Sequence, residues 1–452
     1  MNTQQLSEIT RQEIKQREEE GCDVAEQRRL LAEAEVLANG QKPEKLDSIL
    51  ASLATLSPAL QYEEPSDLEG IRACRPEGPR QIRNLFSIPD LLNRTLGGWL
   101  ARCAGCLLGK PVENWTRAQV KAVAVPDNNY PVRDYFGALT IPVGKRSMFR
   151  SCLRGNITHM VRDDDIDYTI TGLLVLERHG FDFTTGQVGR FWLEELPFLK
   201  TYTAERVAYR NLVDGLDASE AGEYRNPHRE WIGAQIRADA FGYVSPGMPE
   251  QAAELAYRDA WLSHRKNGIY GAMFVAAMIA AAYVQNDIRR IIGTGLSEIP
   301  RKSRLAEAVE DIVAAWDKYR DWEQVADRID ERYGNLQGCH TITNAAVVVL
   351  GLLAGEDDFT EGLAASIMPG YDTDCNGATV GSILGVRLGA EKLPPHWTGP
   401  LNDTVRSALF SLHEARISEL ACRTVALVER HTAQRDEDDP VLWKTGPEDG
   451  TR

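Results

Sequence analysis

Two short runs of aspartate are the residues of this sequence best suited to chemistry. Asp163, Asp164 and Asp165 stand side by side, directly ahead of an apolar segment with helical periodicity. Asp372 and Asp374 form a second run, "DTD", ahead of another helical segment. Because adjacent carboxylates repel each other and one is enough to cap a helix, each run carries more negative charge than a helix start needs.

If the two helix starts converge, five carboxylates share one site, and cations are needed between them. Hard oxygen ligands of this kind suit Mg²⁺ or Mn²⁺, and two clusters suit a pair of ions. The alternative is a pair of solvated acidic caps that never meet, since negative charge is also favourable at an isolated helix N-terminus.

Two stripes of small residues indicate how the aspartates are positioned. The stripe that follows the second run consists of Gly377, Gly381, Gly385 and Gly389. An earlier stripe at the same four-residue spacing consists of Gly97, Ala101, Gly105 and Gly109. Glycine costs a helix roughly 1 kcal/mol relative to alanine, but it leaves a smooth face for close packing. We therefore expect these two helices to lie near each other, each beginning or ending beside the site.

The surrounding pattern is that of an all-α protein. Helical periodicity dominates from about residue 89 to 432, and alternating strand patterns are scarce, with Tyr130–Ile141 the segment most compatible with short strands. We predict a polar, helical N-terminal extension at 1–88, one large α-helical domain at 89–432, and a charged, flexible tail at 433–452. The Ala-rich stretch Gly271–Val284 is too short for a membrane span and predicts a buried helix.

Composition narrows the function classes. The 452 residues carry a formal net charge of −15, which argues against a broad nucleic-acid footprint. No secretory signal pattern is visible at the N-terminus, so we expect a cytoplasmic protein with neither nucleic-acid nor membrane partners. The pair Cys103 and Cys106 forms a lone CxxC without the second pair that a zinc site needs, and two buried small residues are the favoured interpretation.

Three ordered motifs carry a resemblance to a known family. "GCLLGKPVE" at 105–113 is similar to G-D-A-x-G-x-P-x-E, "DDDI" at 163–166 to [TS]-D-D-T, and "GYDTDC" at 370–375 to G-G-D-T-D-[TS]. The central stretch 231–274 resembles the family's G-N-G-A-x-M-R-x-A-P-x-G region and the segment after it. The sequence thus resembles the ADP-ribosylglycohydrolase family, whose best known bacterial members remove ADP-ribose from dinitrogenase reductase.

The resemblance implies a compact orthogonal bundle of helices with a binuclear magnesium or manganese centre in a cleft. The metal ligands carried over from the motifs are Asp163, Asp164, Asp165, Asp372, Asp374 and Cys375. The register of the first run allows one alternative, in which Arg162 fills the [TS] position. The spacing of apolar residues in the following helix favours the register in which Asp163 fills it.

Three departures from the family pattern bear on the metal. Asp163 replaces a hydroxyl ligand and adds negative charge. Cys375 replaces another hydroxyl, and a soft thiolate is a poor partner for Mg²⁺, so either water takes that position or the site favours a softer metal. Cys106 stands where the family usually has an aspartate.

The implied function is a metal-dependent hydrolase that cleaves an N-glycosidic (ADP-)ribosyl bond. Two ions grip the ribose hydroxyls, and metal-activated water attacks ribose C1. Asp164 and Asp374 are the candidate catalytic bases.

Residues expected to contact substrate come from several segments. They are Glu113, Gly233, Gln235, Arg237, Asp239, His264 and Tyr371. For Arg237 and Asp239 a buried ion pair is the alternative, and for His264 a purely structural role. Tyr371 is the strongest candidate to stack on a ring, whereas core packing is favoured for Trp192 and Trp231.

The sequence leaves the identity of the leaving group open. An ADP-ribosylated protein and a small nucleotide or NAD-derived N-riboside are both compatible with the motifs. A non-catalytic binder of ADP-ribose is a third alternative, which the persistence of five aspartates disfavours.

Overall fold

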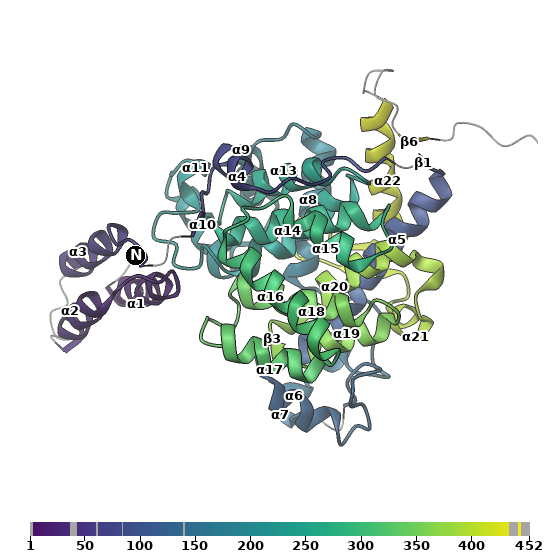
Figure 1. The fold of residues 1–452 in the computed structure, drawn as a ribbon, viewed down its shortest axis with the longest axis horizontal. Coiled ribbons are helices and arrows are strands. Elements are labelled where there is room, and N and C mark those ends of the chain that lie inside the picture. The colour runs from purple at the N-terminus through teal and green to yellow at the C-terminus, as the bar shows by residue number, and fades with distance from the viewer. Residues whose placement is uncertain are drawn as a thin grey trace, which may run out of the picture.

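Helices make up almost all of the regular structure, and the prediction of an all-α fold is confirmed (Figure 1). The computed structural model describes residues 3–36, 43–59, 62–83, 85–138, 141–433 and 442–443. Its α-helices are α1 (Thr3–Glu19), α2 (Ala25–Val36), α3 (Pro43–Ala54), α4 (Leu68–Cys74), α5 (Ile88–Gly109), α6 (Arg117–Ala124), α7 (Val143–Arg146), α8 (Asp164–His179), α9 (Thr185–Glu195), α10 (Thr203–Val213), α11 (Ala218–Ala221), α12 (Asp239–Tyr243), α13 (Pro249–Ala260), α14 (Asn267–Ala282), α15 (Ile288–Leu296), α16 (Arg304–Tyr319), α17 (Trp322–Tyr333), α18 (Thr341–Ala354), α19 (Phe359–Ile367), α20 (Thr373–Leu388), α21 (Pro395–Thr398) and α22 (Ile417–Ala433). Turns of 3₁₀ helix are η1 (Lys110–Val112), η2 (Arg150–Cys152), η3 (Phe198–Lys200), η4 (Ile232–Arg237), η5 (Ala390–Lys392) and η6 (Gly399–Leu401).

The glycine-rich helices α5 and α20 pack against each other along their length. A Cβ added at Gly105 would collide with the carbonyl of Gly377, and one at Gly381 would collide with the carbonyl of Ala101. Backbones approach this closely only where side chains are absent or minimal. The expected pairing of the two small-residue stripes is confirmed.

Helix α14 runs through the main apolar core, and every one of its residues is buried. The prediction of a buried helix from its Ala-rich sequence is therefore confirmed. Its neighbours in the core include α12, α13, α15 and the 3₁₀ turn η4, and η4 contributes to the site described below. In the part of the chain that the structure describes, no helix is long and apolar enough to span a membrane.

Helices α1, α2 and α3 form a small unit with an apolar cluster of its own, at one side of the larger body (Figure 1). Leu6, Ile14, Leu46 and Leu53 are among the buried residues of that cluster. Helix α4 differs, because its Ile71 belongs to the large core instead. The predicted extension 1–88 thus contains both an appended three-helix unit and a segment packed into the main body.

Strands are short and come in pairs. β1 (Leu85–Phe86) pairs in parallel with β6 (Leu442–Trp443), β2 (Trp115–Thr116) pairs antiparallel with β3 (Gly370–Tyr371), and β4 (Thr404–Arg406) pairs antiparallel with β5 (Glu414–Arg416). The suggestion of strands at Tyr130–Ile141 is wrong for 130–138 and Ile141, which are irregular. Of the tail 433–452, the described residues are Ala433 and the two of β6, so its predicted flexibility lies outside the described residues.

Candidate metal centre

The first aspartate run begins α8. Asp163 is the N-cap residue, and its carboxylate accepts a hydrogen bond of 3.0 Å from the backbone N–H of Asp165. Asp164 and Asp165 lie in the first turn, where free N–H groups favour negative charge. Asp163 and Asp165 are buried, whereas Asp164 keeps part of its side chain exposed.

The second run begins α20, with Asp372 at the N-cap position. Tyr371 directly before it has φ +67°, in the left-handed region that costs a residue other than glycine free energy. This backbone is held in place because Trp115 pairs with Tyr371 across β2 and β3, and the N–H of Asn114 donates to the Tyr371 carbonyl at 2.9 Å. The segment directly after the first motif therefore holds the start of the last motif in place.

Contacts across the helices bring the two runs together. The Thr373 hydroxyl donates to the carbonyl of Gly109 at 2.8 Å, so the end of α5 lies against the start of α20. The Cys375 thiol donates to the Asp165 carboxylate at 3.4 Å, which joins the starts of α20 and α8. The alternative of two acidic caps that never meet is therefore wrong.

A lysine that sequence analysis assigned no role lies inside the acidic cluster. Lys110 follows α5, and its Nζ contacts the Asp163 carboxylate. Burial opposes the lysine charge, but the negative charges of Asp163 and Asp374 outweigh burial and raise the pKa of Lys110. Burial likewise acts to raise the Asp163 pKa, and Lys110 outweighs it, so the Asp163 pKa is lowered. This pair is ionised.

The remaining carboxylates are compensated less: Arg102 lies 3.7 Å from Asp165, and Asp374 forms no ion pair among the described residues. Burial raises the pKa of Asp165 and Asp374 well above the usual range, and neighbouring carboxylates raise both further. One oxygen of each, Oδ1, is buried without a hydrogen-bond partner among the described residues. An unsatisfied buried carboxylate oxygen is costly, and a bound cation would remove that cost and keep both groups ionised.

Two sets of potential ligand atoms are close enough to hold cations. The donor atoms of Asp372, Asp374 and Cys375 lie within 4.8 Å of one another, as do those of Cys106, Asp163 and Asp165. Burial raises the pKa of both thiols well above the usual cysteine value, so each is a neutral and weak ligand. The carboxylates are the atoms that fit Mg²⁺ or Mn²⁺. Of the residues predicted to bind metal, Asp164 alone lies outside both sets.

A cavity of about 360 Å³ opens over both sets. It is lined by Lys110, Glu113, Asn114, Arg162, Asp163, Asp164, Asp165, Tyr202, Thr203, Glu205, Trp231, Ile232, Gly233, Ile236, Cys339, Asp372, Asp374 and Cys375. Glu113 and Gly233 are the predicted substrate-contacting residues in this lining. Burial, followed by the charges of Asp372 and Asp163, raises the Glu113 pKa to about 7.

The other predicted substrate contacts lie behind or beside the wall. Arg237 is buried between Asp259 and Glu205, with nitrogen–oxygen distances of 2.6 and 2.7 Å. It therefore acts on the cavity through Glu205, which lines it. His264 is fully buried, with its ring 2.8 Å from the Ser263 hydroxyl.

Asp239 is 3.0 Å from Arg102, and Arg102 donates to the backbone carbonyl of Asp165 at 2.8 Å. The buried ion pair considered for Asp239 is present, but with Arg102 rather than with Arg237. Its effect on the site is to hold the first turn of α8. Gln235 is buried in η4.

The three aromatic candidates occupy different places. The hydroxyl of Tyr371 donates to Asp330 at 2.5 Å, and the residue is not part of the cavity lining. Trp192 is fully buried, whereas Trp231 lines the cavity. Trp231 is thus better placed than Tyr371 to contact a ring in the cavity.

Several lining residues were not predicted from the sequence. They are Asn114, Tyr202, Thr203, Glu205 and Cys339, besides Lys110 and Arg162. A signal existed for Lys110 and Arg162, since both are charged residues inside or directly beside a recognised motif. Glu205 and Cys339 reach the cavity through long-range packing that no local pattern indicates.

The comparisons with known proteins agree with this arrangement. A family model described as ADP-ribosylglycohydrolase matches residues 87–435. The chain belongs to the ADP-ribosylglycohydrolase family, and it is accordingly a hydrolytic enzyme. No curated protein matches the sequence.

A solved structure described as "ADP-ribosylglycohydrolase-related protein complex" is similar, with a TM-score of 0.50 and 19% sequence identity. The similarity covers 75% of this chain and 99% of that one. At this identity it shows a shared fold.

Proposed function

We propose that this protein hydrolyses an N-glycosidic bond to the ribose of an ADP-ribosyl conjugate, using divalent cations held by the two aspartate runs. The observation that carries the proposal is the convergence of Asp165 and Asp374 in one cavity, each with a buried oxygen that accepts no hydrogen bond from the described residues. Family membership supplies the class of bond.

The residues that hold the ions are the carboxylates of the two sets. Asp372 and Asp374, with Cys375 or water, hold the first ion, and Asp163 and Asp165 hold the second. Mg²⁺ and Mn²⁺ both suit such oxygen ligands. When bound, a divalent cation orients vicinal hydroxyls and makes water more acidic.

The two ion positions differ in affinity, because the second ion has to displace Lys110 from Asp163. Like charges at contact distance repel by about 4 kcal/mol per pair of unit charges near a protein surface. At the Asp372 and Asp374 set the competition is weaker, because the Lys110 charge acts on Asp374 but its contact is with Asp163. We therefore expect ordered binding, with the Asp372 and Asp374 set filled first.

The proton acceptor is Asp164 or Asp374. Asp164 is partly exposed to the cavity, and burial and the neighbouring Asp163 raise its pKa well above the usual range. A carboxylate with a raised pKa accepts a proton from water more readily. Arg162 lies 4.0 Å from Asp164 and orients it.

Wall residues bind the rest of the substrate. Trp231 offers an aromatic surface, Gly233 allows close approach of a ligand to the backbone, and Glu113 faces the second aspartate run from the opposite motif. Arg237 positions Glu205 rather than contacting a phosphate. In this arrangement the ribose lies over the carboxylates, and the rest of the substrate lies along η4.

The decisive experiment measures ADP-ribose release from arginine-ADP-ribosylated protein and from small N-ribosides, with and without Mn²⁺ or Mg²⁺. Metal-dependent release that is lost in Asp374→Asn supports the proposal. Release from small ribosides alone assigns a small conjugate as substrate. Tight ADP-ribose binding without turnover of any conjugate would show a binder and refute the hydrolase.

A further inference from the structure

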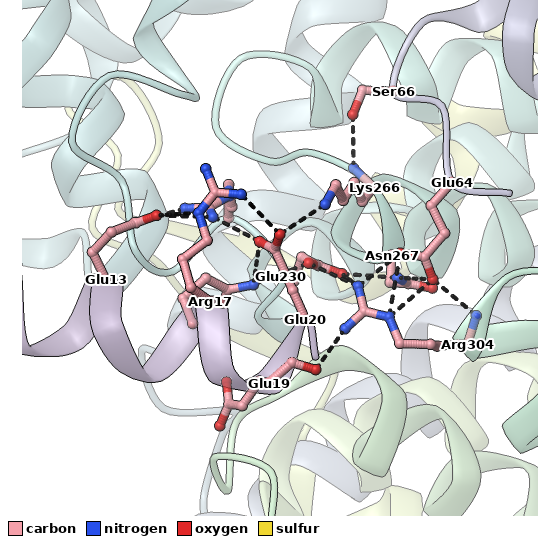
Figure 2. A network of polar contacts seen from close by, with 12 residues as sticks. Glu13, Arg17, Glu19, Glu20, Glu64, Ser66, Glu230, Lys266, Asn267 and Arg304 are labelled. Atoms are coloured by element: carbon pink, nitrogen blue, oxygen red, sulfur yellow. Dashed lines mark hydrogen bonds and ion pairs between the residues drawn. The ribbon is translucent and has the colours of Figure 1, made fainter. Parts of the chain in front are cut away.

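The N-terminal unit meets the main domain through buried polar side chains rather than through its apolar cluster. Figure 2 shows the carboxylates of Glu13, on α1, and of Glu20 directed at basic side chains, and Arg229 of the main domain pairs with both. Glu13, Gln16 and Glu20 are all less than 10% exposed, although each is polar. Since α1–α3 already have a separate core, this interface is not needed to complete that core.

Arg229 is the first residue that α1 holds. Its guanidinium donates to Glu13 at 2.7 and 3.0 Å and to Glu20 at 2.6 Å. Glu20 also accepts from Lys266 at 2.8 Å. Burial acts to raise the Glu20 pKa, but Arg229, Lys266 and Arg17 outweigh it and lower that pKa, so the carboxylate is ionised.

Glu230, the next residue, is held from both sides. The Gln16 amide donates to it at 2.9 Å, and Arg304 donates to it at 2.7 and 3.0 Å. Arg304 in turn donates to the backbone carbonyl of Glu19 at 3.1 Å. Residues 229 and 230 are therefore held by contacts from the last two turns of α1 and from Glu20, directly after it.

A second segment of the main domain is held by the same end of α1. The Glu19 carboxylate accepts from the backbone N–H of Gln337 at 2.8 Å. Lys15 donates to the backbone carbonyl of Asn335 at 3.1 Å. These contacts fix backbone rather than side chains, so they set the path of the loop 334–340.

Both held segments continue directly into the cavity wall. Trp231, Ile232 and Gly233 follow Arg229 and Glu230, and Cys339 follows Gln337. The two segments also bind each other, because the N–H of Ile232 donates to the Cys339 carbonyl at 2.9 Å. A displacement of α1 would therefore move both walls together.

We propose that α1 is a positioning element for the substrate cavity, acting through Glu13, Gln16, Glu19 and Glu20 on the segments 229–233 and 335–341. The wall of the cavity that contains Trp231 is then correctly positioned for binding only while the N-terminal unit is docked. That the wall binds ADP-ribose rests on the proposed function, whereas the positioning itself does not.

The test compares Glu20→Gln with Glu8→Gln in the full chain. Glu8 is on the same helix, but it is exposed and pairs with Arg11 at the surface, so it is a matched control. Glu20→Gln removes one of the two carboxylates that Arg229 contacts and the carboxylate that Lys266 contacts, so both cations lose compensation. We expect backbone amide exchange in 229–233 and 335–341 to rise at least about tenfold in Glu20→Gln, with no change in Glu8→Gln and partial recovery in Glu20→Asp.

Binding of ADP-ribose by calorimetry gives the second readout. Affinity should fall at least about tenfold in Glu20→Gln, with the exchange of α20 unchanged. Unchanged exchange in both segments, an even rise across the chain, or unaltered affinity would overturn the proposal. If Glu20→Gln does not fold, Glu13→Gln, which leaves Glu20 on Arg229, is measured in the same way. If the wild type binds no ADP-ribose, the proposed function fails, and the exchange data alone decide the positioning role.

Discussion

Lys110 and Asp163 form an ion pair inside the acidic cavity, at the point where the end of α5 meets the start of α8. The lysine is a cation that the protein itself supplies to one of its two sets of carboxylates. It contacts Asp163 and its charge also acts on Asp374, whereas the cation beside Asp165 is Arg102, at 3.7 Å. This asymmetry separates the two cation positions energetically.

Replacing the lysine should strengthen binding of the second cation. In Lys110→Met the competing charge is lost, so we expect Mn²⁺ to bind the Asp163 set at least about tenfold more tightly. The gain at the Asp372 and Asp374 set should be smaller, because the Lys110 charge acts on Asp374 without contacting it. Calorimetric titration with Mn²⁺ measures both constants. Identical titrations for variant and wild type would contradict the role given to Lys110.

Removing the Asp374 charge from the Asp372 and Asp374 set should abolish binding of the first cation. Asp374→Asn keeps the side-chain shape but removes a ligand, and we expect Mn²⁺ affinity to fall by more than about a hundredfold. Asp330→Asn, which alters an acid outside the cavity that pairs with Arg117 and Tyr371, should bind Mn²⁺ as the wild type does. Equal losses in both variants would indicate a general structural effect.

Close packing of α5 on α20 should make the fold sensitive to a single methyl group. In Gly105→Ala the new Cβ meets the backbone of Gly377, so we expect a loss of about 1–3 kcal/mol in the free energy of unfolding. Urea denaturation measures it. Gly144→Ala, where a Cβ meets nothing within 4 Å, is the control and should show no loss.

The docking of α1 predicts a specific response to pH. The lowered pKa of Glu20 means that its ionised form is favoured in the folded state, so its stabilisation is complete above the usual value of 4.5 and is lost as pH falls below it. The difference in unfolding free energy between wild type and Glu20→Gln should be about 3–5 kcal/mol at pH 7. It should shrink by about 1.4 kcal/mol per pH unit below 4.5. A constant difference between pH 7 and pH 3 would show that the Glu20 charge is not what stabilises the interface.

Local patterns in the sequence predicted the centre of the fold well. The four-residue glycine spacing predicted the contact of α5 with α20 because it reflects the packing requirement itself. Convergence of the two aspartate runs was one of two interpretations of the residues alone, and the resemblance of three ordered motifs to the family favoured it. The membership of Cys375 in one ligand set followed from the motif alone.

Long-range pairing could not be predicted in the same way. Arg237 and Asp239 were grouped because they are neighbours in sequence, but each binds a partner on another element, Asp259 and Arg102 respectively. Tyr371 was predicted to stack on substrate, whereas its hydroxyl pairs with Asp330 on α17. Nothing in the polar sequence of α1 indicates that its carboxylates meet Arg229.

The measurement that tests the central claim most directly is an anomalous difference map from crystals equilibrated with Mn²⁺. The account predicts a strong peak between the carboxylates of Asp372 and Asp374, and a weaker peak between those of Asp163 and Asp165 that gains occupancy in Lys110→Met. A cavity without any peak at saturating Mn²⁺ would contradict the claim that these carboxylates form a cation centre.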